Sequence, residues 1–187
     1  MTKWEKEEGI IFLKKVGVRQ GQAVLDFGCG SGNYTIIAAK IVGDEGKIYA
    51  LDKNSEKLDK LKERLQKEGL YNVTIVKKSE DVNISLKENS IDSVLLYDVI
   101  HLVGKKNSSK KADREKLYNE IYRIAKEDGL ISVYPTHLET HTDVGNIEEI
   151  KKEILNYGFK LEKEFSEKLI HDDNKEIGTI INFRKLK

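Results

Sequence analysis

The sequence predicts an α/β fold built on a doubly wound, mostly parallel sheet, and three observations favour it. Short apolar runs of strand length alternate with longer segments whose apolar residues recur at helical spacing. The run at residues 24–27 passes directly into a turn with three glycines at alternate positions. A second run, at residues 47–51, follows a glycine-bounded turn and ends at an acid, Asp52. Together they indicate the strand, turn, helix and second strand of one βαβ unit.

The glycine-rich turn has the pattern D-x-G-x-G-x-G, from Asp26 through Gly28, Gly30 and Gly32. A residue without Cβ can take positive φ, and it lets a ligand lie directly against the backbone. A dinucleotide-binding turn would place its third glycine one position later, where this chain has Asn33. The spacing therefore favours a ligand with a cationic amino-acid end and no phosphate, and it disfavours a nicotinamide dehydrogenase.

Asp52 completes this pattern at the end of the second predicted strand. An acid at the tip of the second strand of such a unit can accept hydrogen bonds from both ribose hydroxyls of an adenosine. Asp52 is therefore expected to bind a ribose.

Four segments then occur in order: VLDFGCGSG, ALDK, IDSVLLYDVIHLV and LNYGFK. In them the chain resembles the class I S-adenosylmethionine-dependent methyltransferases, in particular the small enzymes that act on free metabolites. The segments are similar to the family's first motif, second motif, fourth strand and the turn before the final strands. The resemblance runs from about residue 4 to the C-terminus. It implies a Rossmann-like sheet of seven strands in the order 3-2-1-4-5-7-6, with the last strand antiparallel and helices on both faces.

The remaining elements follow from periodicity and from end signals. An N-terminal helix over residues 4–16, ending at Gly17, is expected to pack over the core. The other expected helices cover residues 33–41, 55–68, a segment containing Leu117, Ile121 and Ile124, and 147–154. The other expected strands cover residues 73–76, 92–97, 129–134, 159–165 and 177–183, with a polar turn, HDDNKE, between the last two. The whole chain, residues 1–187, is predicted to be one domain.

The resemblance implies S-adenosylmethionine as cofactor and S-adenosylhomocysteine as product. The residues predicted to bind the cofactor are Asp26, Gly28, Gly30, Gly32, Asp52, Lys53, Ser79, Glu80 and Tyr97. Tyr97 ends the fourth strand and is expected at the methionine end. Ser79 stands where the family usually has an aspartate that meets the adenine amino group. For Ser79 and Glu80, the alternative is a solvated turn rich in charge.

Few catalytic side chains are needed, because a sulfonium is already a good leaving group and the protein must mainly align the reacting atoms. His101, just past the fourth strand, is predicted as a general base; the alternative is a packing role. His137 and His141 follow the fifth strand and are predicted to contact the substrate. Their spacing would bring two metal ligands together only on a helix, and this segment follows a strand and Pro135, so no metal is expected.

The composition limits the partners. The charged share is 35%, yet the net charge is only +1, so no global field favours nucleic acid or membrane. The lone cysteine, Cys29, cannot form an internal disulfide, and the N-terminal sequence has no apolar signal core, so a cytoplasmic location is expected. The predicted function is methyl transfer from S-adenosylmethionine to an O, N, S or C atom of a small molecule. The alternatives are methyl transfer to RNA or protein, and a protein that binds S-adenosylmethionine without turnover.

Overall fold

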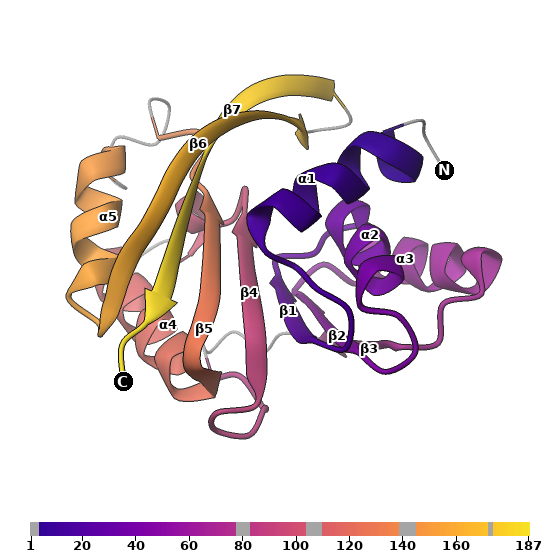
Figure 1. Ribbon diagram of the computed structural model, residues 1–187, viewed down its shortest axis with the longest axis horizontal. Coiled ribbons are helices and arrows are strands. Elements are labelled where there is room, and N and C mark those ends of the chain that lie inside the picture. Colours follow the sequence, from indigo (N-terminus) through magenta and orange to yellow (C-terminus); the bar gives the residue numbers. More distant parts are fainter. Residues whose placement is uncertain (1–3, 78–82, 104–109, 139–144, 172–173) are drawn as a thin grey trace.

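The computed structural model describes residues 4–77, 83–103, 110–138, 145–171 and 174–187. Its centre is one seven-stranded sheet in the order β3-β2-β1-β4-β5-β7-β6 (Figure 1). The strands are β1 (Ala23–Phe27), β2 (Lys47–Asp52), β3 (Val73–Lys77), β4 (Ile91–Tyr97), β5 (Ala125–Tyr134), β6 (Phe159–His171) and β7 (Asn174–Lys185). The pairs among β1 to β5 are parallel, and β7 runs antiparallel to both β5 and β6. The predicted fold class and strand order are confirmed.

Helices flank the sheet, and side-chain caps mark the start of two of them. They are α1 (Gly9–Val16), α2 (Asn33–Val42), α3 (Ser55–Glu68), α4 (Lys110–Ile124) and α5 (Ile147–Leu155), with a π-helical turn η1 (Trp4–Glu8) and a 3₁₀ turn η2 (Ile100–Leu102). The side chain of Asn54 accepts a hydrogen bond from the Lys57 amide at the start of α3, and Gly69 ends that helix in a left-handed conformation. Asn146 and Glu149 form a reciprocal capping box at the start of α5.

The two faces of the sheet bury different helices, as a doubly wound fold requires. Val24, Ile48 and Leu95 pack in the cluster that contains the apolar side of α1 and α2. The next residue along two of these strands, Leu25 or Leu96, packs instead with α4 and α5. This alternation is the period of two expected for strands buried on both faces. The α3 leucines pack with α2 and β2 in a smaller cluster.

The hairpin of β6 and β7 is longer than the sequence predicts. It arches past the ends of the other strands and reaches α1 (Figure 1). The prediction of a polar turn over residues 171–176 is wrong at both ends, because β6 continues to His171 and β7 begins at Asn174. Pairing continues from Phe159 opposite Lys185 to His171 opposite Asn174, and Leu169 is buried in the cluster below α1. Cross-strand pairing and this buried anchor keep the polar residues in strand conformation.

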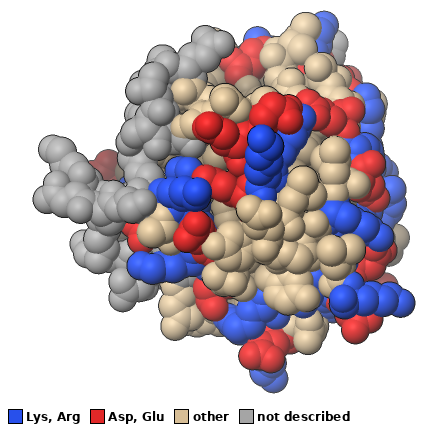
Figure 2. Space-filling view, turned by 90° about the vertical axis from the view of Figure 1, so that its left-hand side faces the viewer, with Lys and Arg blue, Asp and Glu red and all other residues tan. Residues whose placement is uncertain are grey.

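The distribution of charge on one face of the molecule agrees with the low net charge. Positive and negative side chains are interspersed over the face that carries α5 (Figure 2). Among the described residues, no helix has the length and apolar character needed to span a bilayer.

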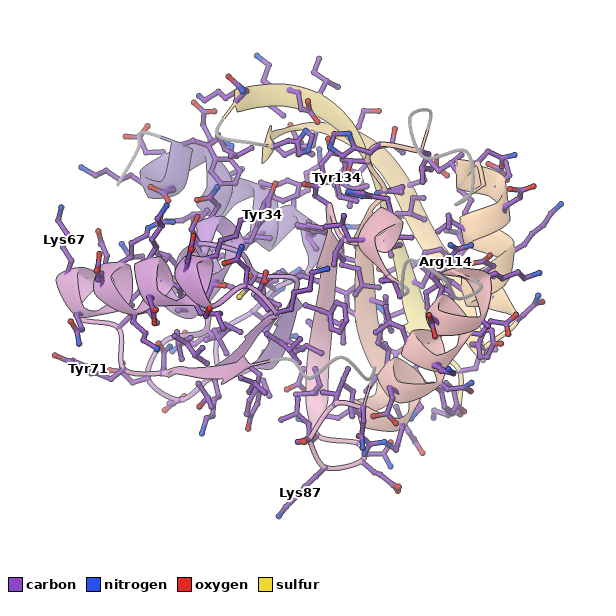
Figure 3. All side chains as sticks on the ribbon, turned by 180° about the vertical axis from the view of Figure 1, so that it is seen from behind. Tyr34, Lys67, Tyr71, Lys87, Arg114 and Tyr134 are labelled. Carbon is purple, nitrogen blue, oxygen red and sulfur yellow. The ribbon has the colours of Figure 1, made fainter. Side chains whose placement is uncertain are left out.

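A buried ion pair joins α4 and α5, the two helices that pack on the same face of the sheet. Arg114 on α4, labelled in Figure 3, donates from Nε and Nη2 to the two carboxylate oxygens of Glu153 on α5, at 2.8 Å each. The Tyr118 hydroxyl lies 3.5 Å from the same carboxylate, and burial raises the pKa of Tyr118 well above its usual value. The bidentate geometry satisfies both charges where little water reaches them.

Candidate functional site

A cavity of about 500 Å³ lies at the carboxyl ends of β1, β2 and β4, the edge where open parallel sheets bind their ligands. The glycine-rich turn, the end of β2, the end of β4 and the tip of β6 all contribute to it. Its lining includes Gly28, Cys29, Gly30, Tyr34, Asp52, Lys53, Asn54, Tyr97, Asp98, Leu102, Ile170 and His171. Five of the residues predicted to bind the cofactor line this cavity: Gly28, Gly30, Asp52, Lys53 and Tyr97.

The glycines of the turn serve two different purposes. Gly28, Gly30 and Gly32 have φ values of 82°, 53° and 91°, all in the region that side chains disfavour. A Cβ at Gly28 would lie 2.5 Å from a Val99 methyl, and one at Gly32 would lie 2.3 Å from a Leu61 methyl. A Cβ at Gly30 would meet nothing closer than 3.7 Å. The outer glycines permit close packing, and the middle one leaves backbone exposed to the cavity.

Asp52 fixes this turn as well as lining the cavity. Its Oδ2 accepts a hydrogen bond from the Gly30 amide, and its Oδ1 accepts one from the Asn54 amide, each at 2.8 Å. A carboxylate has about four acceptor positions, so two backbone bonds leave capacity for ligand hydroxyls. The position fits the predicted ribose contact, and the tie to the glycine turn is an added role.

Asp26 lies behind the turn. Its side chain is buried and accepts a hydrogen bond from the Thr35 hydroxyl at 2.6 Å. Burial raises the pKa of Asp26 to about 6, against the opposing effect of the Thr35 hydrogen bond, and the nearby charge of Asp52 raises it further. Asp26 is not among the described residues that line the cavity, so its contact with a cofactor stays a prediction.

Two tyrosines form an aromatic wall. The rings of Tyr34 and Tyr97 meet edge to face with centroids 4.8 Å apart, and both line the cavity. The Tyr97 hydroxyl pairs with Ser132 Oγ at 2.8 Å, and the Tyr34 hydroxyl donates to the Ile170 carbonyl at 2.7 Å. Figure 3 shows Tyr34 below the β6–β7 hairpin. Tyr34 was not among the predicted residues, although its place as the second residue of the helix after the third glycine was an available signal.

Arg64 is a second residue that sequence reasoning missed. From α3 it donates to the Ser31 carbonyl at 2.8 Å and to Asn33 Oδ1 at 3.0 Å, and it also pairs with the Glu5 carboxylate. It therefore joins the N-terminal π turn to the glycine-rich turn. No local pattern marks Arg64 among the other charged residues of α3.

The lone cysteine of the turn is buried, and burial raises the pKa of the Cys29 thiol far above its usual range. A protonated thiol is a poor nucleophile, and Cys29 packs in the apolar cluster with α2 and α3, so its role is that of a small residue of the turn.

The remaining predicted residues belong to both the cofactor side and the substrate side of the site. Lys53 is exposed and lines the cavity. His101 is buried in η2, its ring 4.9 Å from that of His137 and its Nδ1 3.7 Å from Asp98 Oδ1. Neither His101 nor His137 is among the described residues that line the cavity. Three other predicted residues lie outside the described part of the chain: Ser79, Glu80 and His141.

Residues 19–184 match a family described as a methyltransferase domain. The chain belongs to this family. It is 30% identical over 138 residues to a demethylmenaquinone methyltransferase of Lactobacillus johnsonii. The aligned region covers 74% of this chain and 52% of that protein. It is 30% identical over 97 residues to a probable cobalt-precorrin-6B C(15)-methyltransferase (decarboxylating) of Saccharolobus solfataricus, 51% of this chain and 48% of that one. This chain thus spans about half the length of these relatives.

Among solved structures, a SAM-dependent methyltransferase from Aquifex aeolicus superposes with a TM-score of 0.77. The match covers 98% of this chain and 93% of that one, at 22% sequence identity. At this identity the likeness shows a shared fold over nearly the whole chain.

Proposed function

We propose that this protein transfers the methyl group of S-adenosylmethionine to an O, N, S or C atom of a small molecule. The observation that carries the proposal is the pairing of Asp52 with the glycine-rich turn at the floor of the cavity. That arrangement offers carboxylate acceptors beside bare backbone, within a chain of the methyltransferase-domain family.

The cavity fits this cofactor in chemistry as well as in place. Asp52 would accept hydrogen bonds from the ribose, and the backbone around Gly30 would lie against the methionine part. The rings of Tyr34 and Tyr97 offer aromatic surface to a cationic sulfur. When bound, S-adenosylmethionine supplies a methyl group on a sulfonium, so the task left to these residues is to orient it and exclude water.

A small-molecule acceptor is supported by the relatives, which are named for demethylmenaquinone and for cobalt-precorrin-6B. The part of the lining that follows β4 or ends β6 has both apolar and polar groups, from Leu102, Ile170, Asp98 and His171. We propose that the acceptor enters there. The role of His137 and His141 as substrate contacts remains part of this proposal.

The first experiment measures cofactor binding by calorimetry and by thermal melting. S-adenosylmethionine and S-adenosylhomocysteine are expected to raise the melting temperature, whereas NAD and ATP at equal concentration are not, because only a ligand of the folded state stabilises it. A shift with NAD alone would contradict the proposal.

A matched pair of variants locates the site. Asp52→Ala should weaken cofactor binding by about 2–4 kcal/mol through loss of charge-assisted hydrogen bonds. The matched control is Asp59→Ala, because Asp59 is an exposed aspartate on α3 that pairs with Lys62 at 2.8 Å and does not line the cavity. This variant should bind the cofactor as the parent does. The melting temperature of Asp52→Ala without ligand shows whether the glycine-rich turn is still stable. It therefore separates a loss of structure from the loss of the cofactor contact. Equal cofactor affinities in Asp52→Ala and Asp59→Ala would remove Asp52 from the site.

Turnover is tested separately, with methyl-labelled S-adenosylmethionine and a panel of quinol, tetrapyrrole, amine and thiol acceptors. Label in one acceptor class supports the enzyme. Tight binding of the cofactor with no labelled product from any acceptor, RNA or protein would instead favour a protein that binds S-adenosylmethionine without turnover.

A further inference from the structure

Three of the four histidines in the sequence gather around one carboxylate. Asp98 follows β4, His101 lies in η2, His137 follows β5, and His171 ends β6. Asp98 and His101 are close in the chain, whereas His137 and His171 come from distant segments. They meet because β4 and β5 are neighbours and the β6–β7 hairpin arches over their ends (Figure 1). The grouping is a product of topology rather than of local sequence.

The polar atoms of the cluster lie at the separations that metal ligands take. Asp98 Oδ1 is 3.7 Å from His101 Nδ1 and 3.6 Å from His137 Nε2, and one ligand atom from each of these three residues lies within 4.8 Å of the others. His171 Nε2 is 3.2 Å from Asp98 Oδ2 and 2.9 Å from His137 Nε2. Ligand atoms of a tetrahedral zinc ion, with bonds near 2.0–2.1 Å, are about 3.3 Å apart.

Outer groups hold these ligands in the orientation that coordination requires. His171 Nδ1 lies 3.1 Å from Glu176 Oε1, so a proton on Nδ1 is held by the carboxylate and Nε2 points toward Asp98. Glu176 in turn accepts a hydrogen bond from the Tyr134 hydroxyl, and Asp98 accepts one from Thr136. A carboxylate behind a histidine is the usual second layer of a protein metal site, where it fixes the tautomer and the ring.

The backbone at two of the four positions is also unusual. Asp98 and His137 have φ values of 52° and 56°, in the left-handed region. That conformation costs a residue with a side chain about 1 kcal/mol, and such costs concentrate at functional positions. Here the left-handed conformation occurs at Asp98, which supplies the shared carboxylate, and at His137, whose Nε2 lies 3.6 Å from Asp98 Oδ1.

We propose that Asp98, His101, His137 and His171 bind one divalent transition metal of the zinc type. Three imidazoles with one carboxylate suit zinc, cobalt or nickel, whereas calcium and magnesium prefer an all-oxygen shell. Because Asp98 and His171 also line the cavity, the metal lies at the acceptor end of the site. The proposal departs from the sequence-based expectation of no metal. It gives His101 the role of a ligand in place of a base, and it gives His137 the role of a ligand in place of a direct substrate contact.

The proposal does not rest on methyl transfer, and its test measures metal alone. The full chain is stripped with chelator, dialysed, and titrated with Zn²⁺ by calorimetry; elemental analysis then gives the metal content after gel filtration. We expect one zinc ion per chain. Cobalt substituted for zinc should give the intense visible absorption of a tetrahedral site.

Variants assign the ligands. Asp98→Asn, His137→Gln and His171→Gln should each lower zinc affinity by more than the 10- to 100-fold expected for the second-layer variant Glu176→Gln. His141→Gln, the fourth histidine and outside the proposed set, is the matched control and should bind zinc as the parent does. Melting of each metal-free variant shows whether it is folded, and three independent ligand variants keep the test valid if one is not.

Absence of stoichiometric zinc in the parent would overturn the proposal, and it would leave the cluster as a hydrogen-bonded histidine group. Zinc binding unchanged in both Asp98→Asn and His137→Gln, or lost in His141→Gln, would overturn the ligand assignment.

Discussion

The buried carboxyl of Asp26 should make the stability of the ligand-free protein fall as pH rises through mildly acid values. Its pKa is about 6 in the folded protein against 3.8 for an unperturbed group. Between these two values the folded state keeps a proton that the unfolded state has released. The folded state therefore binds more protons, and the free energy of unfolding decreases with rising pH in this window. Above pH 6 the loss is complete.

The magnitude follows from the size of the shift. A difference of 6 − 3.8 = 2.2 in pKa corresponds to about 3 kcal/mol, at about 1.4 kcal/mol for each unit. Because the side chain is only 3% exposed, solvent does little to screen this effect. Asp26→Asn removes the titration but keeps an oxygen that can accept from the Thr35 hydroxyl. The stability of the parent relative to Asp26→Asn should therefore fall by about 2 kcal/mol between pH 4.5 and 7.5.

The assay is urea unfolding without cofactor at several pH values for the parent, for Asp26→Asn and for Asp59→Asn as an exposed control. The comparison cancels the titration of all other groups. A difference between parent and Asp26→Asn that stays constant within about 0.5 kcal/mol from pH 4.5 to 7.5 would refute the reasoning. So would the same pH dependence in Asp59→Asn.

Two other substitutions should show which contacts hold the frame of the site. Gly32→Ala should destabilise the protein by about 2 kcal/mol or more, because a Cβ there would overlap a leucine of α3. The control Gly21→Ala also has positive φ but open space around it, so it should cost only about 1 kcal/mol. Similar losses for the two variants in urea unfolding would argue against the packing role of Gly32. Glu153→Gln should cost about 3–5 kcal/mol by leaving the buried charge of Arg114 uncompensated, whereas Glu148→Gln at the exposed start of α5 should change stability by less than about 0.5 kcal/mol. Equal melting temperatures for the two glutamate variants would contradict this assignment.

The fold could be predicted because its information is local. Apolar runs, glycine spacing and capping residues each act over a few positions, and the family resemblance arranged them into one sheet order. The place of Asp52 at the end of β2 was predictable for the same reason, since a strand tip is a local feature, whereas its contact with a ribose stays a prediction. Its bond to the Gly30 amide adds to that prediction without changing it.

The rest of the site depends on contacts between distant segments. His171 could not be anticipated, because its place over Asp98 depends on a hairpin that continues well past its predicted end. His101 was singled out from its position after β4, but the ring of His137 that it faces follows a different strand, β5. Arg64 reaches the glycine-rich turn from α3, and nothing in the helical pattern distinguishes it from its solvent-facing neighbours.

Arg64 also connects the start of the chain to the floor of the cavity. Its guanidinium contacts Glu5 in the π turn and the Ser31 carbonyl in the glycine-rich turn. Unfolding of the π turn and movement of the glycine-rich turn would therefore both break hydrogen bonds of Arg64. The two events are therefore coupled, and a ligand that restrains the glycine-rich turn restrains the π turn through the same side chain. Amide hydrogen exchange in α1 should slow when the cavity is filled, although none of that helix lines it among the described residues. By reciprocity, a peptide or tag that pulls the π turn away from the body should lower the affinity for a ligand that it never touches.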